Sequence, residues 1–208
     1  MPGGKLIITS VVGLLLIGAT AFGAARFGTS SVAEPSPPAP PPERQSGARL
    51  WYPSGSYPSL ALPGGREETV RSILNIQSAM KFGDFVWDDK GIPDGPLWVR
   101  ADLDRQIISV FRNGHEIGTA VILYGADSKP TPAGVFPVLE KSADYHSRTY
   151  DAPMPFTLRL TADGVAIHGS DVRERFATHG CIGVPLEFAR RLFEQTRVGD
   201  DVFILKTA

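Results

Sequence analysis

Apolar and polar side chains alternate with a period of two in successive runs over residues 97–124, and this alternation restricts the fold more than any other feature of the chain. Runs at 97–103 and 106–111 are followed directly by Asn113-Gly114, a dipeptide that readily adopts the positive φ angles of a tight hairpin. Residues 116–124 supply the returning strand. Because successive side chains of a strand point to opposite faces, the pattern predicts a meandering β structure.

Two other segments change to helical spacing. The first, at residues 66–82, carries acidic side chains in its first turn and stops before Gly83. The second begins at Pro185, a residue suited to a first helical turn, and ends at Gly199. Further strands are predicted at 135–139, 156–160, 165–168 and 201–205. The expected fold class is mixed α/β and β-dominated, with two principal helices.

The N-terminal part of the chain has a different composition. Residues 6–25 form an uncharged, mostly apolar run, and a helix of this length, at about 1.5 Å per residue, matches a hydrocarbon core of about 30 Å. We expect a hydrophobic helix in 1–29 that acts as a signal peptide or a membrane anchor, and both forms stay open. We expect a proline-rich linker to follow at 30–48. An extension at 49–96 comes next, and its one helix is expected to pack on the main domain, which spans 97–206.

Charge and cysteine content restrict the partners. The net charge of -1 offers no broad basic field, so we expect no nucleic-acid partner. The single cysteine, Cys181, has no intramolecular partner, although exported proteins usually pair their thiols. A lone thiol of this kind is a crosslink point, a buried inert residue or a reactive nucleophile.

Two histidines are candidate partners of this thiol. His168 ends a predicted strand, and His179 lies in the loop that precedes Cys181. An adjacent imidazole can hold a thiol as a thiolate–imidazolium pair, and His168, approaching from a facing strand, is the better candidate base. The residues alone favour catalysis, but a metal site built from His168, His179 and Cys181 and a purely structural cysteine remain open.

Glycines beside these residues allow a substrate backbone to approach closely. They are Gly169 and Gly180. Backbone N–H groups around Gly180, where the loop is expected to enter the second helix, are candidates for an oxyanion hole, and Gly169 or Ser170 is a candidate to orient the imidazole. Of the remaining histidines, His115 beside the Asn113-Gly114 turn is expected to be exposed and inert, and His146 in the polar run 141–148 is expected to be a loop residue rather than a substrate contact.

Three sequence elements occur in a specific order. Ile167-His168-Gly169-Ser170 precedes Thr178-His179-Gly180-Cys181-Ile182, and both follow a Thr131-Pro132-Ala133-Gly134-Val135-Phe136 turn and a Met154-Pro155-Phe156 element. Together they resemble the L,D-transpeptidase catalytic domain family (YkuD-like), over residues 97–206. The resemblance implies a YkuD-like β-sandwich with a helix after the cysteine loop, and it implies neither a metal nor an organic cofactor.

The resemblance also implies a reaction on peptidoglycan stem peptides. Cys181 would attack the third-residue carbonyl of a tetrapeptide stem and release the terminal D-alanine, with His168 as general acid/base. An amine of another stem would then resolve the thioester to give a 3-3 crosslink. Thr178, His179 and Gly180 match motif positions that shape the loop and the oxyanion site. Gly169 matches the position whose carbonyl often orients the histidine.

Gly183 departs from the family pattern, which usually has arginine after Cys-Ile. The missing guanidinium would suit a stem carboxylate, and Arg173 or Arg175 is a candidate substitute, with Met154 as a further substrate contact. Two alternatives stay open: an L,D-carboxypeptidase, in which water resolves the thioester, and a non-catalytic cell-wall-binding module. The expected location is the periplasm or cell envelope, with the inner membrane as a partner if residues 6–25 are uncleaved.

Overall fold

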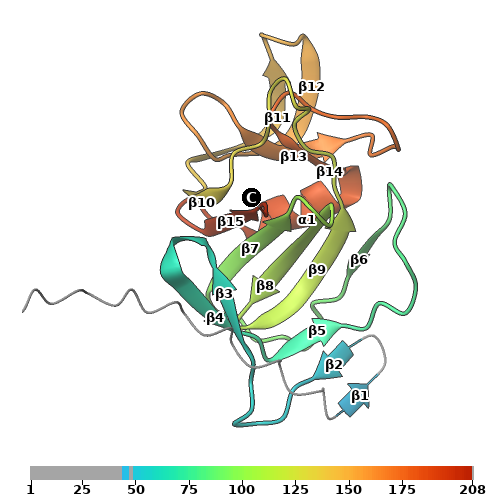
Figure 1. The fold of residues 1–208 in the computed structure, drawn as a ribbon, viewed down its shortest axis with the longest axis vertical. Helices are drawn as coiled ribbons and strands as arrows, with labels where there is room; N and C mark the ends of the chain where they lie inside the picture. Colours follow the sequence, from blue (N-terminus) through green and yellow to red (C-terminus); the bar gives the residue numbers. More distant parts are fainter. Residues whose placement is uncertain (1–43, 47–48, 208) are drawn as a thin grey trace, which may run out of the picture. The chain divides into compact units, whose positions relative to one another are not determined.

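The computed structural model describes residues 44–46 and 49–207, so the expected signal or anchor and most of the proline-rich linker lie outside the described residues. In this part of the chain, two main sheets and one α-helix form a β-dominated mixed fold (Figure 1). None of the helices in the described ranges is long and apolar enough to cross a membrane.

The larger sheet has nine strands in the order β1-β2-β5-β9-β8-β7-β15-β10, with β6 also paired to β9. Its strands are β1 (Arg44–Ser46), β2 (Arg49–Trp51), β5 (Ser72–Leu74), β6 (Phe85–Trp87), β7 (Leu97–Asp102), β8 (Ile107–Arg112), β9 (His115–Val121), β10 (Gly134–Pro137) and β15 (Asp201–Leu205). Strands β7, β8 and β9 form the predicted meander, with Asn113 and Gly114 at φ angles of 50° and 79° in the turn. The sheet is not a meander throughout, because β15 returns to pair parallel with β7.

The smaller sheet has four strands in the order β11-β12-β13-β14. They are β11 (Glu140–Ser147), β12 (Ala152–Arg159), β13 (Ala166–Ser170) and β14 (Ile182–Pro185). The sequence analysis predicts loops where β11 and β14 form. The polar strand β11 is paired to β12 from Glu140 to Ser147, so His146 lies on a strand. The short strand β14, which contains Gly183, is buried throughout and runs parallel to β13.

The helix predicted at 66–82 is wrong. The chain forms β4 (Arg66–Thr69) and β5 there, and β4 is paired to β3 (Ser59–Leu62) across the short 3-10 turn η1 (Pro63–Gly65). Gly64 and Gly65 adopt φ angles of 74° and 70°, which turn the chain back on itself. The small hairpin covers the face of the large sheet on which Trp98 stacks against Phe111 at 3.9 Å.

Burial in this segment has the period of a strand. The buried residues are Val70, Ser72 and Leu74, and the residues between them are more exposed. A polar side chain at Ser72 occupies the buried face, so hydrophobicity alone does not reveal the alternation. The spacing of Val70, Ile73 and Leu74 then imitates a helix.

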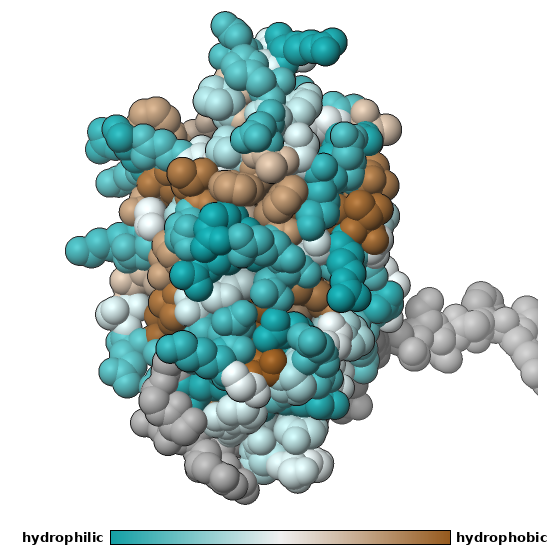
Figure 2. Space-filling model, turned by 180° about the vertical axis from the view of Figure 1, so that it is seen from behind, coloured by the Kyte–Doolittle hydropathy of each residue, from teal (hydrophilic) through white to brown (hydrophobic). Residues whose placement is uncertain are grey.

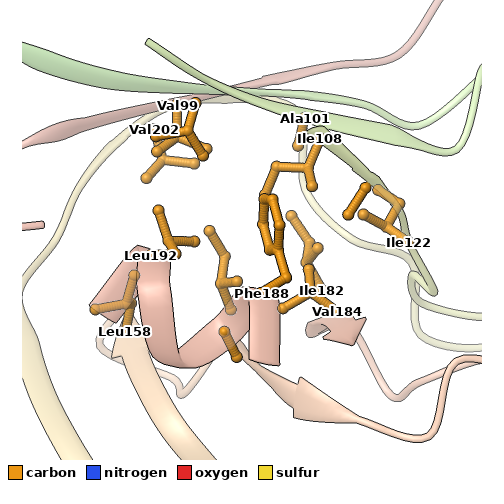
Figure 3. Close-up of a cluster of buried hydrophobic side chains, with 14 of the residues drawn as sticks. Val99, Ala101, Ile108, Ile122, Leu158, Ile182, Val184, Phe188, Leu192 and Val202 are labelled. Carbon is orange, nitrogen blue, oxygen red and sulfur yellow. The ribbon is translucent and has the colours of Figure 1, made fainter. Parts of the chain in front are cut away.

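The helix α1 (Leu186–Gln195) lies between the two sheets (Figure 3). It starts after Pro185, as predicted, and directs the buried side chains of Phe188 and Leu192 into the core. Burying a side chain of this size contributes about 1.5–3 kcal/mol. The surrounding core residues come from both sheets and include Val99, Ala101, Ile108, Ile122, Leu158, Ile182, Val184 and Val202. Exposed large hydrophobic side chains are scattered, and Figure 2 shows a mostly hydrophilic face with separate apolar patches.

The helix ends at Gln195 rather than at the predicted Gly199. The N–H of Thr196 donates to the Leu192 carbonyl at 2.9 Å, and Lys141 on β11 donates to the carbonyls of Phe193 and Thr196. A cation at this position satisfies the last carbonyls and interacts favourably with the negative end of the helix dipole. The β11–β12 hairpin and the helix are therefore linked through Lys141.

A buried polar network attaches the N-terminal extension to the large sheet. Arg49 donates to Ser72 Oγ at 3.1 Å, and Ser72 Oγ is hydrogen-bonded to His115 Nδ1 at 2.8 Å. The Glu116 carboxylate accepts the N–H of Leu74 at 2.9 Å. His115 is only 7% exposed, so its expected place in an exposed loop is wrong.

Replacing His115 with asparagine should reduce the acid sensitivity of the fold. Burial, with Arg49 and Arg71, lowers the pKa of His115 to about 4, whereas its unfolded pKa is about 6.5. The unfolded chain therefore binds more protons between these values, and His115 removes stability as the pH falls from 6.5 toward 4. Asparagine can keep the hydrogen bond to Ser72 without titrating.

Urea unfolding at pH 7.5 and pH 4.5 checks this prediction. The free energy of unfolding should fall by about 2 kcal/mol more in the wild type than in His115→Asn. The raised pKa of Glu116 is common to both proteins, so its effect cancels in the comparison. Equal losses in the two proteins would contradict the prediction.

Candidate active site

Cys181 lies directly before β14, so the loop that carries it enters a strand rather than the helix that the sequence analysis predicts. The N-terminus of α1 therefore does not supply the N–H groups at Cys181. In the parallel pairing of β13 and β14, Gly183 is opposite His168 and Ile182 is opposite Ile167. The thiol and the imidazole thus extend from adjacent chain segments. Cys181 lies two residues before Gly183, the residue opposite His168.

The His168 ring is oriented by the backbone next to it. The side chain is 9% exposed, and its Nδ1 lies 2.9 Å from the carbonyl oxygen of Gly169. Because a carbonyl can only accept, Nδ1 carries the proton, and Nε2 is the nitrogen that can take one. The expected contact with Gly169 is present. Gly169 also lacks a side chain for a packing reason, since a Cβ there would lie 2.9 Å from Leu186 Cδ1.

The cysteine loop is fixed by the segment that follows β9. The N–H of Thr178 donates to the Tyr124 carbonyl at 3.0 Å, and the N–H of Ala126 donates to the Thr178 carbonyl at 3.1 Å. The Thr178 hydroxyl also donates to the carbonyl of Cys181. Gly180 is buried with a φ of 104°, a conformation that favours glycine. The Thr178 hydrogen bonds and the Gly180 backbone conformation thus contribute to the shape of this loop, and the implied oxyanion role stays a prediction.

Gly125 is a site residue that sequence reasoning missed. A Cβ at this position would lie 2.2 Å from the Lys129 carbonyl oxygen and 2.8 Å from the Cα of Gly180. Its N–H donates to Thr131 Oγ1 at 2.9 Å. The absent side chain therefore lets the turn that contains Lys129 pack directly against the cysteine loop.

A cavity of about 140 Å³ opens beside Cys181. Its lining includes the predicted residues Met154 and His179, together with Lys129 and Tyr150, which the sequence analysis did not single out. His179 is exposed, and its ring stacks on Tyr150 with centroids 4.3 Å apart. The proximity of Lys129 to the Thr-Pro turn is a sequence signal that could have identified it, whereas nothing in the sequence around Tyr150 does so.

The hairpin β11–β12 contributes the wall that contains Met154. Met154, Tyr145 and Gly164 line both the Cys181 cavity and a second cavity of about 140 Å³. A larger open hollow of about 690 Å³ lies beside η1 and the ends of β7 and β15, and neither cysteine nor histidine lines it. The small cavities are therefore the ones relevant to Cys181.

The two arginines proposed as substitutes are absent from the lining of the Cys181 cavity. Arg173 is exposed and paired with Asp171 at 2.6 Å, and Arg175 is exposed with a φ of 68°. Ser170 lies close to the missing arginine position, because a Cβ on Gly183 would be 3.0 Å from Ser170 Cβ. This arrangement provides no support for an anchoring role of either arginine.

Burial shifts the pKa of both candidate catalytic groups so that the neutral form of each is favoured. It raises the pKa of the Cys181 thiol, which a backbone hydrogen bond from Ala166 and the charge of Lys129 partly oppose. It lowers the pKa of His168, partly opposed by the bond to Gly169. The thiol donates to the Gly164 carbonyl at 3.7 Å. These shifts favour a resting thiol and neutral imidazole over the expected ion pair.

The metal alternative receives no support from the described ranges, 44–46 and 49–207. No group of three or more histidine, cysteine, aspartate or glutamate side chains there is arranged to hold a metal ion. His168 Nδ1 is hydrogen-bonded to the Gly169 carbonyl, and the His179 ring stacks on Tyr150.

Gly125→Ala should be strongly destabilising. The contacts of the added methyl group would be backbone atoms, which cannot rotate away, so we expect a loss above about 3 kcal/mol, at the upper end of overpacking effects. Gly183→Ala is the matched control, because its nearest contact is the Ser170 side chain at 3.0 Å and a small shift can relieve it. Urea unfolding of both variants tests this, and similar losses would contradict the steric argument.

The Cys181 thiolate should appear only above the ordinary thiol pKa of about 8.5. The measurement is the pH dependence of thiolate absorbance, taken as the difference between wild type and Cys181→Ala. Lys129→Met should move the midpoint further upward, because the Lys129 charge lowers the pKa of Cys181. Lys90→Met removes an exposed lysine outside the cavity lining and should leave the midpoint unchanged. A midpoint below pH 7 would instead indicate a resting ion pair.

Solved structures of other proteins resemble the fold of this chain. An L,D-transpeptidase (Yku) from Stackebrandtia nassauensis is 21% identical, with a TM-score of 0.51 over 55% of this chain and 58% of that chain. This likeness supports a shared fold. An L,D-transpeptidase from Mycobacterium smegmatis is 24% identical over 53% of this chain and 58% of that one, with a TM-score of 0.49. The C442S mutant of an Enterococcus faecium L,D-transpeptidase is 26% identical over 54% and 50%, also at 0.49.

The chain thus spans 58% of the Stackebrandtia protein. A comparison with curated proteins gives no match. The L,D-transpeptidase catalytic domain (YkuD) matches residues 96–204, more than half of the chain. This family consists of cysteine L,D-transpeptidases that act on peptidoglycan stem peptides in the cell envelope. By this match, the chain belongs to the L,D-transpeptidase catalytic domain (YkuD) family.

Proposed function

We propose that this protein is a peptidoglycan L,D-transpeptidase with Cys181 as nucleophile and His168 as general acid/base. One observation carries the proposal: the hydrogen bond from His168 Nδ1 to Gly169 leaves Nε2 free to take a proton, on the strand beside the one that Cys181 precedes. Family membership supports the same roles.

In the first step, the Cys181 sulfur bonds to the third-residue carbonyl carbon of a tetrapeptide stem while its proton passes to His168 Nε2. The backbone N–H groups of Gly180 and Cys181 are the candidate donors to the oxyanion. When the tetrahedral intermediate collapses, the carbon–nitrogen bond breaks and the imidazolium protonates the leaving D-alanine amine. A thioester remains on Cys181.

In the second step, an amine of another stem attacks the thioester carbonyl. His168 takes a proton from the attacking nitrogen and returns it to the departing sulfur, so the thiol is regenerated and a 3-3 crosslink forms. Attack by water would instead give a tripeptide, the product of an L,D-carboxypeptidase. Both steps are proton and acyl transfers, and the proposal includes no cofactor.

The proposed place of action is the periplasm or cell envelope, where the family acts. The apolar run at 6–25 would export the domain and, if uncleaved, hold it at the inner membrane. The proline-rich linker would then act as an extended spacer between membrane and wall.

The second candidate is a non-catalytic wall-binding module. Gly183 favours it, because the position lacks the guanidinium usual in the family and no arginine within residues 44–46 and 49–207 lines the Cys181 cavity. Such a module would retain the fold and bind stem peptides without forming a thioester.

Intact mass spectrometry of the full-length protein with a disaccharide-tetrapeptide tests the proposal. We expect an acyl adduct on the wild type and none on Cys181→Ala. His168→Ala should slow adduct formation by at least about 100-fold, the lower range of general acid–base effects. His146→Ala is the matched control, because this histidine is exposed on β11 and outside the cavity lining.

The products distinguish the alternatives. Crosslinked dimer made only by the wild type supports the transpeptidase, and tripeptide alone supports the carboxypeptidase. A folded wild type that binds the peptide but forms neither adduct nor product would overturn the enzymatic proposal in favour of the binding module.

A further inference from the structure

The cavity beside Cys181 carries two opposite charges. Among the described residues that line it, Lys129 is the only lysine or arginine and Asp163 is the only carboxylate. Both charges act on the sulfur, because Lys129 lowers the pKa of Cys181 and Asp163 raises it. Both side chains line the same cavity as the thiol, so each can meet a ligand group bound there.

The Lys129 ammonium is positioned by its neighbours. Its Nζ donates to the Tyr150 hydroxyl at 2.8 Å, and the Tyr150 ring stacks on His179. Its backbone N–H donates to the Ala126 carbonyl at 2.8 Å, within the turn that packs on Gly125. A side chain that is already held loses less conformational entropy when it binds a ligand.

Asp163 is positioned by the turn that also contacts the thiol. The Thr161 hydroxyl donates to the Asp163 carboxylate and accepts the N–H of Val165 at 2.9 Å. The carbonyl of Gly164, the next residue, accepts the Cys181 thiol at 3.7 Å. The carboxylate and the nucleophile are therefore held by one short segment.

The hydrogen-bond partners of these two charges are neutral hydroxyls. Lys129 bonds to Tyr150 and Asp163 bonds to Thr161, so each keeps capacity for a charged ligand group. Gly183 provides no cation, and Arg173 is engaged with Asp171. A ligand with a carboxylate and an ammonium on one carbon offers a partner to each charge.

We propose that Lys129 and Asp163 bind the ammonium–carboxylate group of an α-amino-acid unit, with Lys129 taking the carboxylate and Asp163 the ammonium. This inference rests on the proposed function and names the chemical group that the site recognises. In this chain Lys129 thus supplies the positive charge that Gly183 lacks. The group has two possible sources: the side-chain end of a diamino dicarboxylic acid in the donor stem, and a separate amino-acid acceptor.

Binding to full-length Cys181→Ala tests the proposal without any chemical step. The probe is a stem tetrapeptide with diaminopimelate as its third residue, compared by calorimetry with the same peptide amidated at the distal carboxylate. Lys129→Met should raise Kd for the free carboxylate about fivefold to tenfold, between the values for exposed ion pairs and for hydrogen bonds to charged groups. The amidated peptide should bind both proteins equally.

Three further variants serve as controls. Lys129→Arg should retain most of the affinity, and Lys90→Met, which removes an exposed lysine elsewhere, should leave Kd unchanged. Tyr150→Phe keeps the ring that stacks on His179 but removes the hydroxyl that holds Lys129, so its effect should be intermediate. The effect of Lys129→Met should shrink in 1 M salt, where the Debye length is about 3 Å.

The second charge is tested in the same way. Asp163→Asn should weaken binding of the peptide with a free distal amine about fivefold and leave the amine-acetylated peptide unchanged. If the same selectivity appears with free diaminopimelate and not with the peptide, the group belongs to the acceptor. Selectivity for the peptide and selectivity for free diaminopimelate each support recognition of the ammonium–carboxylate group by Lys129 and Asp163.

Equal effects of Lys129→Met on the carboxylate and the carboxamide would show a structural role and overturn the inference. Unchanged Kd in both Lys129→Met and Asp163→Asn, or no measurable binding of either zwitterionic probe, would overturn it as well. Its failure is separate from failure of the proposed function. A wild type that recognises the group but forms no thioester would overturn only the enzymatic proposal.

Discussion

Two backbone hydrogen bonds between Leu123 and Gly183 join the two sheets of the domain. Each residue donates to the carbonyl of the other at 2.9 Å, and Leu123 follows directly from the core of the large sheet while Gly183 lies in β14 of the small one. The next residues, Tyr124 to Ala126, continue with bonds to Thr178. The loop that carries Cys181 is therefore held from the large sheet, while the strand that carries His168 belongs to the small sheet. The position of the thiol relative to the imidazole depends on this connection together with the parallel pairing of β13 and β14.

Close approach of backbones at this connection accounts for two glycines. At Gly125 an added Cβ would collide with the backbone of Lys129, and at Gly183 it would crowd Ser170. Position 183 is thus a buried strand position with little room for a side chain in this protein. The Lys129 turn, packed against Gly125, brings a different cation to the cavity. Close packing at Gly183 leaves little room for the arginine that is usual at this position. The packing of the Lys129 turn on Gly125 instead places a lysine at the cavity.

Much of the fold could be predicted from the sequence, because several elements have strong local signals. The β7–β9 meander follows from alternation and from Asn113-Gly114, and the start of α1 follows from Pro185. Tertiary interactions decide the remaining elements. Ser72 lies on the buried face of β5 because it bonds to Arg49 and His115, and a hydrophobic pattern cannot contain that information.

The candidate site shows the same division. His168, Gly169, Thr178, Gly180 and Cys181 lie in two short motifs, so local sequence is enough to select them. Gly125, Lys129 and Tyr150 reach the site through pairings between distant segments, such as the bridge from Gly125 to Thr178. A sequence taken alone gives no distance between those segments. Arg173 and Arg175 are near Cys181 in the chain but are not part of the cavity lining, because proximity in the chain does not ensure proximity in space.

Partial burial of the thiol also bears on how a lone cysteine could persist in the cell envelope, the place of action proposed for this protein. The thiolate is the form that oxidises and exchanges with disulfides, and its fraction falls as the thiol pKa rises. Burial raises the pKa of Cys181, and the bond to Gly164 holds the protonated form. Burial also lowers the pKa of His168, which favours the neutral imidazole with its proton on Nδ1. Under the proposed function, such a site would form the thiolate only during the reaction, which would reconcile an unpaired cysteine with an oxidising compartment.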